Sequence, residues 1–306
     1  MIEIAFRKPS IDDQELLEPY FKADPHAMSC EMTFANLFLW SGHYRGEFAV
    51  LDDMLVIRAG AGNNVSFAYP MGIHDPAPVV QKLMDYCAER GIPFRMHGVT
   101  NDKRADLEAA FPGKFDFIPD RDSADYIYLS EDLIHLKGKK YHGKRNHINR
   151  FKEENNWSYE PITRENMDDC MAFALEWCKQ NGCDDDGRLA EVCVIRNAFR
   201  YFERLRLVGG ALRIDGKMVA FTIGEPMNED VFVVHIEKAD ASINGAYPTI
   251  NQEFIAHEAG SYRYINREED LGIEGLRKAK LSYRPVIILE EYQVVPRTEN
   301  DVPQDS

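Results

Sequence analysis

Long apolar runs are missing from this 306-residue chain, and none approaches the ~18 residues that a membrane-spanning helix needs. The first residues, Met1–Arg7, alternate like a short strand and do not resemble a charged leader before an apolar segment. Positive charge is also scarce, since 36 Lys and Arg stand against 51 Asp and Glu. The net charge of −15 disfavours broad binding to nucleic acid or anionic membranes unless a local basic patch overrides it.

Cysteine spacing gives no metal signature. No pair is arranged as CxxC, and no paired histidines accompany the six cysteines, which are Cys30, Cys87, Cys170, Cys178, Cys183 and Cys193. We therefore expect small buried thiols, no metal site and a reduced, cytoplasmic compartment.

The common catalytic motifs are absent too. GxSxG, the Walker loop and HExxH do not occur, which removes the usual serine-hydrolase, NTPase and zincin interpretations. Gly60-Ala-Gly62 begins like a dinucleotide loop, but it lacks the third glycine and leads into a strand pattern, so we expect a hairpin turn.

What is present is a repeated order of elements. Both halves read strand, two helices, three strands, helix, strand, helix and two strands, although no residue-level repeat accompanies this order. Chain length favours two domains, and 44% apolar residues can fill two cores. We predict an α+β protein of two similar domains, 1–135 and 136–306, each with a mixed sheet of about seven strands.

A basic run crosses the predicted boundary. Lys137–Lys152 holds seven Lys or Arg and no acid, with aromatic residues between the cations. Such a cluster, Lys144 and Arg145 among it, can neutralise several phosphates. The alternative is a solvated linker helix whose charges pair with the acidic surface.

The stretch Tyr262–Pro285 combines many charges at one strand-to-helix turn. A period-2 strand is followed by the acidic step Glu268–Asp270 and by a helix from about Leu271 to Leu281. Arg277 and Lys280 lie on one helix face, and Asn266 and Tyr283 flank the turn. These residues form either a binding site or a well-capped helix with solvated charges.

A second candidate segment is Val231–Gln252. Strict alternation would place His235 and Glu237 on one strand face together with Val231 and Val233. A loop with Asn244 and Gly245 then leads into a helix N-terminus, which is suited to an anion. Gly245 alone is more simply explained as a turn residue.

Four segments resemble the family of phosphatidylglycerol lysyltransferase C-terminal domains: Lys139–His147, Ala220–Glu225, Val234–Lys238 and Ile265–Lys280. The likeness extends from about Thr33 to Pro285. It implies tandem GNAT-like acyl-CoA N-acyltransferase domains, each a mixed β-sheet flanked by helices, with the active site in the second. Characterised members move an aminoacyl group from aminoacyl-tRNA to a lipid. The transmembrane flippase module of many such synthases is absent here, which leaves the acceptor open.

Acyl transfer needs a deprotonated nucleophile and a donor to the developing oxyanion, which suggests roles for the residues of these segments. We expect catalytic groups at His235, Glu237, Asn266 and Asp270, and substrate or phosphate contacts at Lys144, Arg145, Asn244, Gly245, Arg277, Lys280 and Tyr283. Ion pairing of Arg277 and Lys280 with Glu268–Asp270 is the structural alternative. Arg277→Ala separates the two interpretations, because it should reduce turnover only if Arg277 binds substrate.

Three functions remain from the sequence. Coenzyme-A-dependent GNATs carry (Gln/Arg)-x-x-Gly-x-(Gly/Ala) after the fourth strand, but Ser242 and Tyr247 stand at the flanking positions here. We therefore expect an aminoacyltransferase that uses aminoacyl-tRNA, requires no cofactor and meets a phospholipid headgroup at a membrane surface. The alternatives are an acyl-CoA-dependent N-acyltransferase acting on a small amine or peptide, and a non-catalytic binding protein. Neither the amino acid nor the oligomeric state is predicted.

Overall fold

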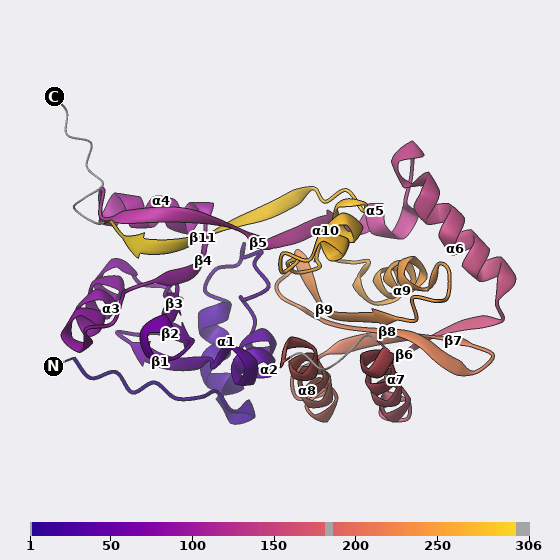
Figure 1. Ribbon diagram of the computed structural model, residues 1–306, viewed down its shortest axis with the longest axis horizontal. Helices are drawn as coiled ribbons and strands as arrows, with labels where there is room; N and C mark the ends of the chain where they lie inside the picture. The colour runs from indigo at the N-terminus through magenta and orange to yellow at the C-terminus, as the bar shows by residue number, and fades with distance from the viewer. Residues whose placement is uncertain (1, 181–185, 298–306) are drawn as a thin grey trace. The chain divides into compact units, whose positions relative to one another are not determined.

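The computed structural model describes residues 2–180 and 186–297, with only the backbone of 186–190 (Figure 1). The chain forms two compact units. The first comprises residues up to Asp24, Trp40–Ala124 and the described residues from Leu289 onward; the second comprises Pro25–Leu39 and Asp125–Ile288. Whereas we predicted two ranges that are continuous in sequence, each of these units is built from separate segments.

The first unit has two helical segments before its sheet and two helices between its strands. Its elements are η1 (Ile11–Asp13), α1 (Gln14–Phe21), β1 (Glu47–Leu51), β2 (Met54–Ala59), η2 (Gly62–Asn64), β3 (Ser66–Ala68), α3 (Ala77–Arg90), β4 (Met96–Thr100) and α4 (Asn101–Ala110), while α2 (Phe34–Tyr44) contributes to both units. Its core joins α3 and α4 to the strands through buried residues such as Leu83, Leu107 and Phe67.

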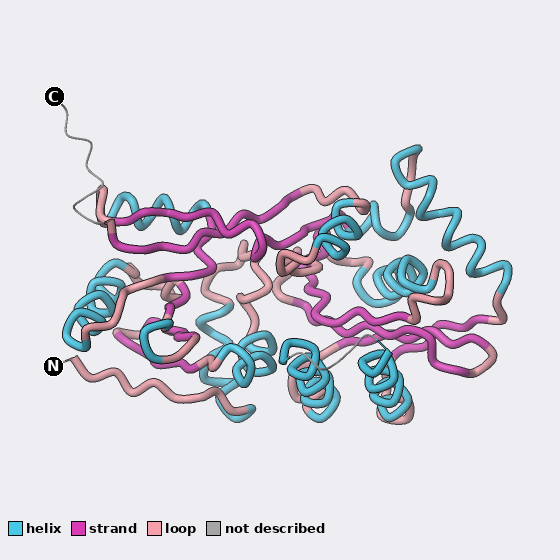
Figure 2. The backbone as a smooth tube through the Cα atoms, in the orientation of Figure 1, coloured by secondary structure: helices cyan, strands magenta, loops and turns pink. Residues whose placement is uncertain are grey.

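The strand expected at the N-terminus does not form. Residues 2–6 are drawn as a loop in Figure 2, and only Arg7 makes a bridge, to Phe48. Ile2, Ile4 and Phe6 nevertheless pack on the core of this unit. Their alternating pattern therefore reflects burial without a partner strand.

The second unit contains the segments that the sequence singled out. Its elements are α5 (Ser130–His135), η3 (Lys139–Tyr141), α6 (His142–Glu154), β6 (Trp157–Pro161), α7 (Met167–Gln180), α8 (Asp186–Arg200), β7 (Val208–Ile214), β8 (Lys217–Pro226), β9 (Val231–Ala239), α9 (Ala246–Phe254), the π-helical η4 (Ile255–Ala259), β10 (Tyr264–Asn266) and α10 (Glu274–Leu281). Figure 1 shows α9 on one face of β7–β9, with α7 and α8 on the other.

Side-chain alternation along β8 explains these layers. The Phe221 ring contacts Phe173 of α7 and Phe199 of α8, whereas the preceding Ala220 packs with Ile250 of α9. Neighbouring residues of a strand point to opposite faces, so an apolar strand such as β8 needs helices on both sides.

Two long strands, β5 (Phe115–Leu129) and β11 (Ile287–Pro296), contribute residues to both units. The hydrogen-bonded strand order is β1-β2-β3-β4-β11-β5-β10-β9-β8-β7-β6. Each unit thus has six described strands when β5 is counted in both and β11 with the first, which is near the predicted seven. The element order alone did not predict these shared strands.

The same strand pattern occurs in each unit. In the first, β1, β2 and β3 pair antiparallel and β4 joins β3 in parallel. In the second, β7, β8 and β9 pair antiparallel and β10 joins β9 in parallel. Mixed sheets with flanking helices confirm the predicted fold class, and the duplicated pattern agrees with the repeated element order.

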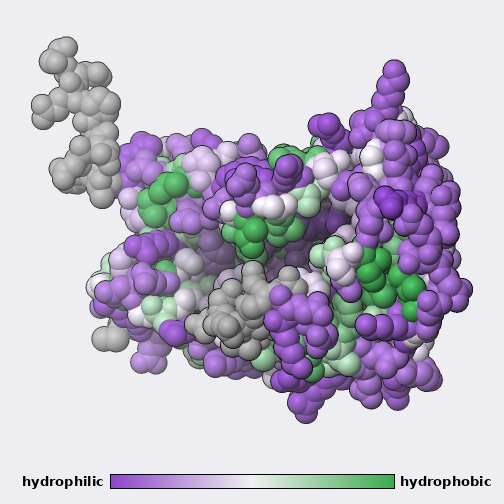
Figure 3. Space-filling model, turned by 45° about the vertical axis from the view of Figure 1, so that its right-hand side comes forward, coloured by the Kyte–Doolittle hydropathy of each residue, from purple (hydrophilic) through white to green (hydrophobic). Residues whose placement is uncertain are grey.

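Charged residues make up 28% of the chain, and hydrophilic residues cover most of the face in Figure 3, with apolar ones gathered in a few patches. Among the described helices, none is long and apolar enough to cross a membrane. Cys30, Cys87 and Cys170 are buried free thiols and Cys193 is an exposed one, but Cys178 forms a disulfide bond. The expectation of a free thiol is therefore wrong for Cys178, because apolar spacing fits a buried disulfide sulfur equally well.

Candidate functional site

The parallel strands β9 and β10 separate after a short contact. They pair only between Val231–Val233 and Tyr264–Asn266, and β9 then continues to Ala239. In the described part of the chain, no strand covers this edge of β9 beyond Val233. Backbone N–H groups at such an edge can donate to an oxyanion, so the uncovered edge of β9 is the candidate centre of the site.

A β-bulge interrupts β9 at His235. Ile223 pairs with Ile236 and Gly224 with Val234, so His235 is an extra residue without an opposite partner. Gly224 is needed here, because a Cβ on it would lie 2.2 Å from the carbonyl oxygen of Val233. A bulge changes the side-chain alternation that follows it.

His235 and Glu237 consequently have separate partners, and the prediction that they share one strand face is wrong. Glu237 reaches Asn251 of α9, with 3.0 Å between Oε2 and Nδ2. His235 lies between two carboxylates, with Nδ1 2.8 Å from Glu268 Oε1 and Nε2 2.9 Å from Glu225 Oε1. Period-2 reasoning cannot anticipate an inserted residue.

The surroundings of His235 keep its imidazole protonated. Burial alone would lower its pKa, but hydrogen bonds to Glu225 and Glu268 outweigh burial and raise the pKa to about 10. Both ring N–H groups donate to carboxylates, so at neutral pH this imidazolium has no free nitrogen with which to accept a proton.

Glu237 connects two groups that the sequence analysis did not single out. Its Oε1 accepts from Arg267 Nη2 at 2.8 Å, while Oε2 accepts from Asn251. Arg267 Nη1 and Asn251 Oδ1 are buried with no hydrogen-bond partner among the described groups. Unsatisfied buried polar atoms are costly, so a donor and an acceptor on either side of Glu237 are both available to a ligand.

Lys144 of α6 adds a second cation to this cluster. Its Nζ lies 3.8 Å from the centre of the Tyr283 ring, and the Arg267 guanidinium carbon lies 4.7 Å from the same centre. Burial, and then repulsion by Arg267, lower the pKa of Lys144 to about 8, while Glu237 opposes the shift. No hydrogen bond of this ammonium to a described group is found. Two cations therefore share one carboxylate, which favours an added anion.

Asn266 holds the end of β10 through its amide. Nδ2 donates to the Met28 carbonyl oxygen at 2.6 Å and to Asp125 Oδ2 at 2.8 Å, and Oδ1 accepts from the Glu268 N–H at 2.6 Å. Asn266 is fully buried. Its observed contacts fix the turn that carries Arg267, and a contact with substrate stays a prediction.

Asp270 and Arg277 form a bidentate pair. Nε and Nη2 of Arg277 lie 2.8 and 2.7 Å from the Asp270 carboxylate, which also accepts from the Tyr126 hydroxyl at 2.5 Å and the Gly272 N–H at 2.9 Å. Burial would raise the pKa of Asp270, but the hydrogen bonds from Arg277 and Tyr126 outweigh it and hold the pKa well below its usual range. These contacts delay α10 to Glu274, three residues later than predicted.

Lys280 donates to backbone oxygens of the same turn. Its ammonium bonds the carbonyls of Arg267, Glu268 and Glu269, the second at 3.0 Å and the third at 2.5 Å. Because all three N–H donors are used within the turn, the structural alternative from the sequence analysis now has direct geometric support. Phosphate binding by Arg277 or Lys280 stays a prediction.

The basic run forms η3 and α6 and is partly paired. Arg145 Nη1 caps the end of α5 through the carbonyls of Leu136 and Gly138, the latter at 2.8 Å, and Lys152 pairs with Glu253 of α9 at 2.5 Å. Lys137 and Lys139 are exposed. The run therefore combines structural cations with solvent-facing ones.

Asn244 and Gly245 lie against α6. Asn244 Oδ1 is 2.7 Å from His147 Nδ1, and a Cβ on Gly245 would lie 2.3 Å from the His147 carbonyl oxygen. Gly245 also has a φ of 86°, which favours glycine. At this point the N-terminus of α9 is thus in close contact with α6, as the two adjacent helices in Figure 1 illustrate.

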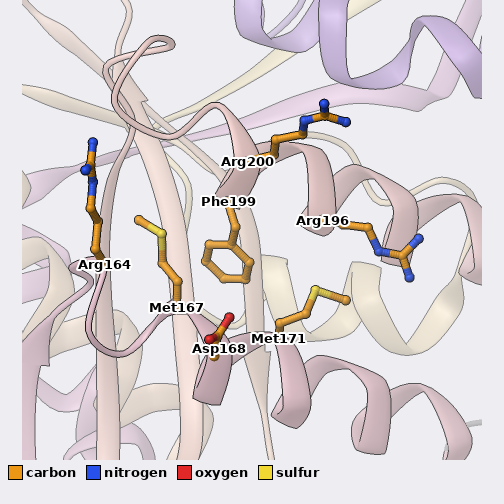
Figure 4. A pocket seen from close by; sticks show the side chains of 7 residues that line it. All are labelled: Arg164, Met167, Asp168, Met171, Arg196, Phe199 and Arg200. Atoms are coloured by element: carbon orange, nitrogen blue, oxygen red, sulfur yellow. The ribbon is translucent and has the colours of Figure 1, made fainter.

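A separate hollow lies between α7 and α8, in the same unit but away from the predicted residues. It has a volume of about 320 Å³ and is lined by Arg164, Met167, Asp168, Met171, Arg196, Phe199 and Arg200. Figure 4 shows the Phe199 ring between the two methionines, with the guanidinium groups directed away from it. Arg164 pairs with Glu203 at 2.6 Å.

The second unit therefore has a mixed sheet with helices on both faces, a separating parallel pair and a buried polar cluster at the separation, which together define a unit of GNAT-like fold. The chain belongs to the family described as phosphatidylglycerol lysyltransferase, C-terminal, whose model matches residues 24–295. Family and fold support a transferase of the aminoacyl kind.

Solved structures agree with this fold. A conserved protein of unknown function from Bacteroides thetaiotaomicron is 45% identical, with a TM-score of 0.90 over 96% of this chain and 100% of that chain. L-PGS from Bacillus licheniformis has a TM-score of 0.68 at 16% identity, over 98% of this chain and 96% of that one. The C-terminal domain of a lysylphosphatidylglycerol synthetase from Agrobacterium fabrum also has a TM-score of 0.68, at 13% identity over 95% and 93% of the two chains.

A curated relative from Mycoplasmoides gallisepticum, itself uncharacterised, is 25% identical over 177 residues. These residues cover 56% of this chain and 56% of that protein, so the chain matches about half the length of the relative.

Proposed function

We propose that the chain transfers an aminoacyl group from aminoacyl-tRNA to a hydroxyl of an acceptor that carries a phosphate, such as a phospholipid headgroup. The observation that carries this proposal is the half-buried pair of cations, Lys144 and Arg267, beside Glu237 at the separation of β9 and β10. Family membership supplies the reaction class.

The phosphate would bind between Lys144 and Arg267. Arg267 Nη1 is buried without a partner among the described groups, and the Lys144 ammonium lies over the Tyr283 ring without a hydrogen bond to any of them. A phosphate oxygen would satisfy the guanidinium N–H and offset the excess positive charge. Exposed Lys137 and Lys139, at the start of the basic run, would meet the backbone of the tRNA.

Transfer is an ester exchange. The acceptor hydroxyl oxygen attacks the ester carbonyl carbon, its proton passes to the Glu237 carboxylate, and an N–H at the uncovered edge of β9 donates to the oxyanion. The bond to the tRNA ribose oxygen then breaks, and that oxygen leaves with the proton. Glu237 can accept the proton because each carboxylate oxygen has a lone pair beyond its bond to Arg267 or Asn251.

Two features favour tRNA over coenzyme A as the donor. The flanking residues of the coenzyme A loop are replaced by Ser242 and Tyr247. The helix N-terminus that follows this loop is in close contact with α6 at Gly245, where even a methyl group would clash. Acyl-CoA thus stays the alternative donor and becomes an arm of the experiment.

The direct test incubates the purified chain with total tRNA charged with labelled amino acids and with vesicles of phosphatidylglycerol and phosphatidylcholine. Label in the extracted lipid supports the proposal, whereas transfer only from labelled acetyl-CoA to an amine would replace it with the alternative. Lys144→Met should reduce transfer at least tenfold, a loss of about 1.4 kcal/mol of transition-state stabilisation. Lys217→Met, which removes an exposed cation from the start of β8, is the matched control.

A further inference from the structure

Three metal-ligating side chains from distant parts of the sequence meet inside the second unit. They are Cys30, Asp125 at the start of that unit's portion of β5, and Glu269 after β10. One ligand atom from each lies within 4.8 Å of the others, and Cys30 Sγ is 3.8 Å from Glu269 Oε2. Cys30 and Asp125 are only 5% and 1% exposed, so bulk water does not solvate these polar side chains.

Asp125 supplies an independent observation. Its Oδ2 accepts from the Cys30 N–H at 2.7 Å and from Asn266 Nδ2 at 2.8 Å, but its Oδ1 is buried with no partner among the described groups. A buried carboxylate oxygen without a donor is rare in folded proteins and needs a ligand or a proton. The unsatisfied oxygen, Asp125 Oδ1, thus belongs to one of the three side chains of this cluster.

Charge points in the same direction. Lys280 interacts electrostatically with Asp125 and Glu269, but its N–H groups are committed to backbone carbonyls. The neighbouring Glu225–His235–Glu268 triple adds two carboxylates for one imidazolium. A divalent cation would displace the proton that the Cys30 thiol donates to Glu269, and the thiolate and the two carboxylates would then balance its charge together with that of Lys280.

We infer that Cys30, Asp125 and Glu269 form a binding site for a divalent transition metal of the Zn²⁺ class. One thiolate selects against Mg²⁺ and Ca²⁺, which prefer oxygen ligands. Tetrahedral Zn²⁺ with bonds of about 2.3 Å to sulfur and about 2.1 Å to oxygen requires ligand atoms about 3.4–3.6 Å apart. The Cys30 Sγ to Glu269 Oε2 distance of 3.8 Å is close to this value, and the ligand atoms, all within 4.8 Å of one another, would draw together on binding. The fourth position would hold water.

The metal would join Cys30, in the segment Pro25–Leu39, to the turn that carries Arg267. This inference does not depend on the proposed transfer reaction, because it rests on side chains that have no role in the proposed chemistry. A protein without transferase activity could still bind the metal, and the reverse also holds.

The test uses the full chain, treated with a chelator and then titrated with Co²⁺ as a spectroscopic probe. We expect one equivalent to bind per chain, with a thiolate-to-cobalt charge-transfer band and visible bands of tetrahedral intensity. Cys30→Ser should remove the charge-transfer band and lower affinity at least tenfold. Cys87→Ser, at another buried thiol, and Cys193→Ser, at the exposed one, should leave the spectrum unchanged.

An absent charge-transfer band in the wild-type protein would overturn the inference, as would an unchanged band in Cys30→Ser. Should Asp125→Asn fail to fold, Glu269→Gln tests the carboxylate ligands, because Glu269 is less buried. Retention of stoichiometric binding in a folded Glu269→Gln variant would also contradict the proposed ligand set.

Discussion

Arg277→Ala separates a structural role of the Asp270–Arg277 pair from a substrate-binding role. The Asp270 carboxylate is fully buried and receives two N–H groups of Arg277, at 2.8 and 2.7 Å. In the variant it keeps the Tyr126 hydroxyl and the Gly272 N–H but loses the cation. The structural role therefore predicts a loss of stability with turnover per folded molecule retained, whereas a substrate-binding role predicts a loss of turnover with little change in stability.

The magnitude follows from burial. Removing one partner of a buried ion pair costs about 3–5 kcal/mol, because the other charge is left uncompensated. The Arg277 side chain is 32% exposed, so water can replace part of the guanidinium, and we expect a loss of about 2–3 kcal/mol. At about 2–4 °C per kcal/mol for a unit of this size, Tm should fall by about 4–12 °C.

Thermal unfolding of the purified variants measures this loss, and transfer assays at a temperature where each is folded measure turnover. Lys278→Ala is the control, since it removes an exposed cation from the same helix. Asp270→Asn combined with Arg277→Ala should lose less stability than the sum of the single changes, because the unpaired charge is removed. A variant with wild-type Tm and tenfold lower turnover would refute the structural role.

Three further predictions concern other parts of the chain. Affinity for inorganic phosphate should decline between about pH 7 and 9 in calorimetric titrations, because Lys144 loses its proton as pH rises through its pKa of about 8; Lys144→Met should bind weakly at every pH. Gly245→Ala should unfold at a lower denaturant concentration than Gly216→Ala. Both glycines have positive φ, but only at Gly245 would the added Cβ clash, 2.3 Å from the His147 carbonyl oxygen. The hydrogen bond from Arg7 lowers the pKa of Asp13 to about 2, so the stability it adds is present above about pH 4 and is lost as pH falls toward 2; Asp13→Asn should flatten that part of the acid-unfolding curve.

Much of the architecture was predictable from local pattern. The order of strands and helices implied two similar mixed sheets, because alternation and helical spacing are properties of neighbouring residues. The basic run around Lys144 and the polar residues near Glu237 were also recognisable, since their density of charge is visible in the sequence.

The details of the site were less accessible. Arg267 and Asn251 stood inside the segments that we selected, but nothing local distinguished them, and their importance comes from buried atoms that lack partners. The bulge at His235 separated it from Glu237, and the shared strands β5 and β11 joined residues of both units into one strand order.

The sequence by itself therefore determined most of the elements and the segments in which charged and polar residues gather, because these depend on residues within a few positions of each other. Tertiary structure alone decided which side chains meet. Cys30, Asp125 and Glu269, whose spacing suggested no metal, lie together because strand pairing and burial act between residues up to 239 positions apart. Burial then sets their charges and partners, since a polar group removed from water depends on the few atoms that surround it.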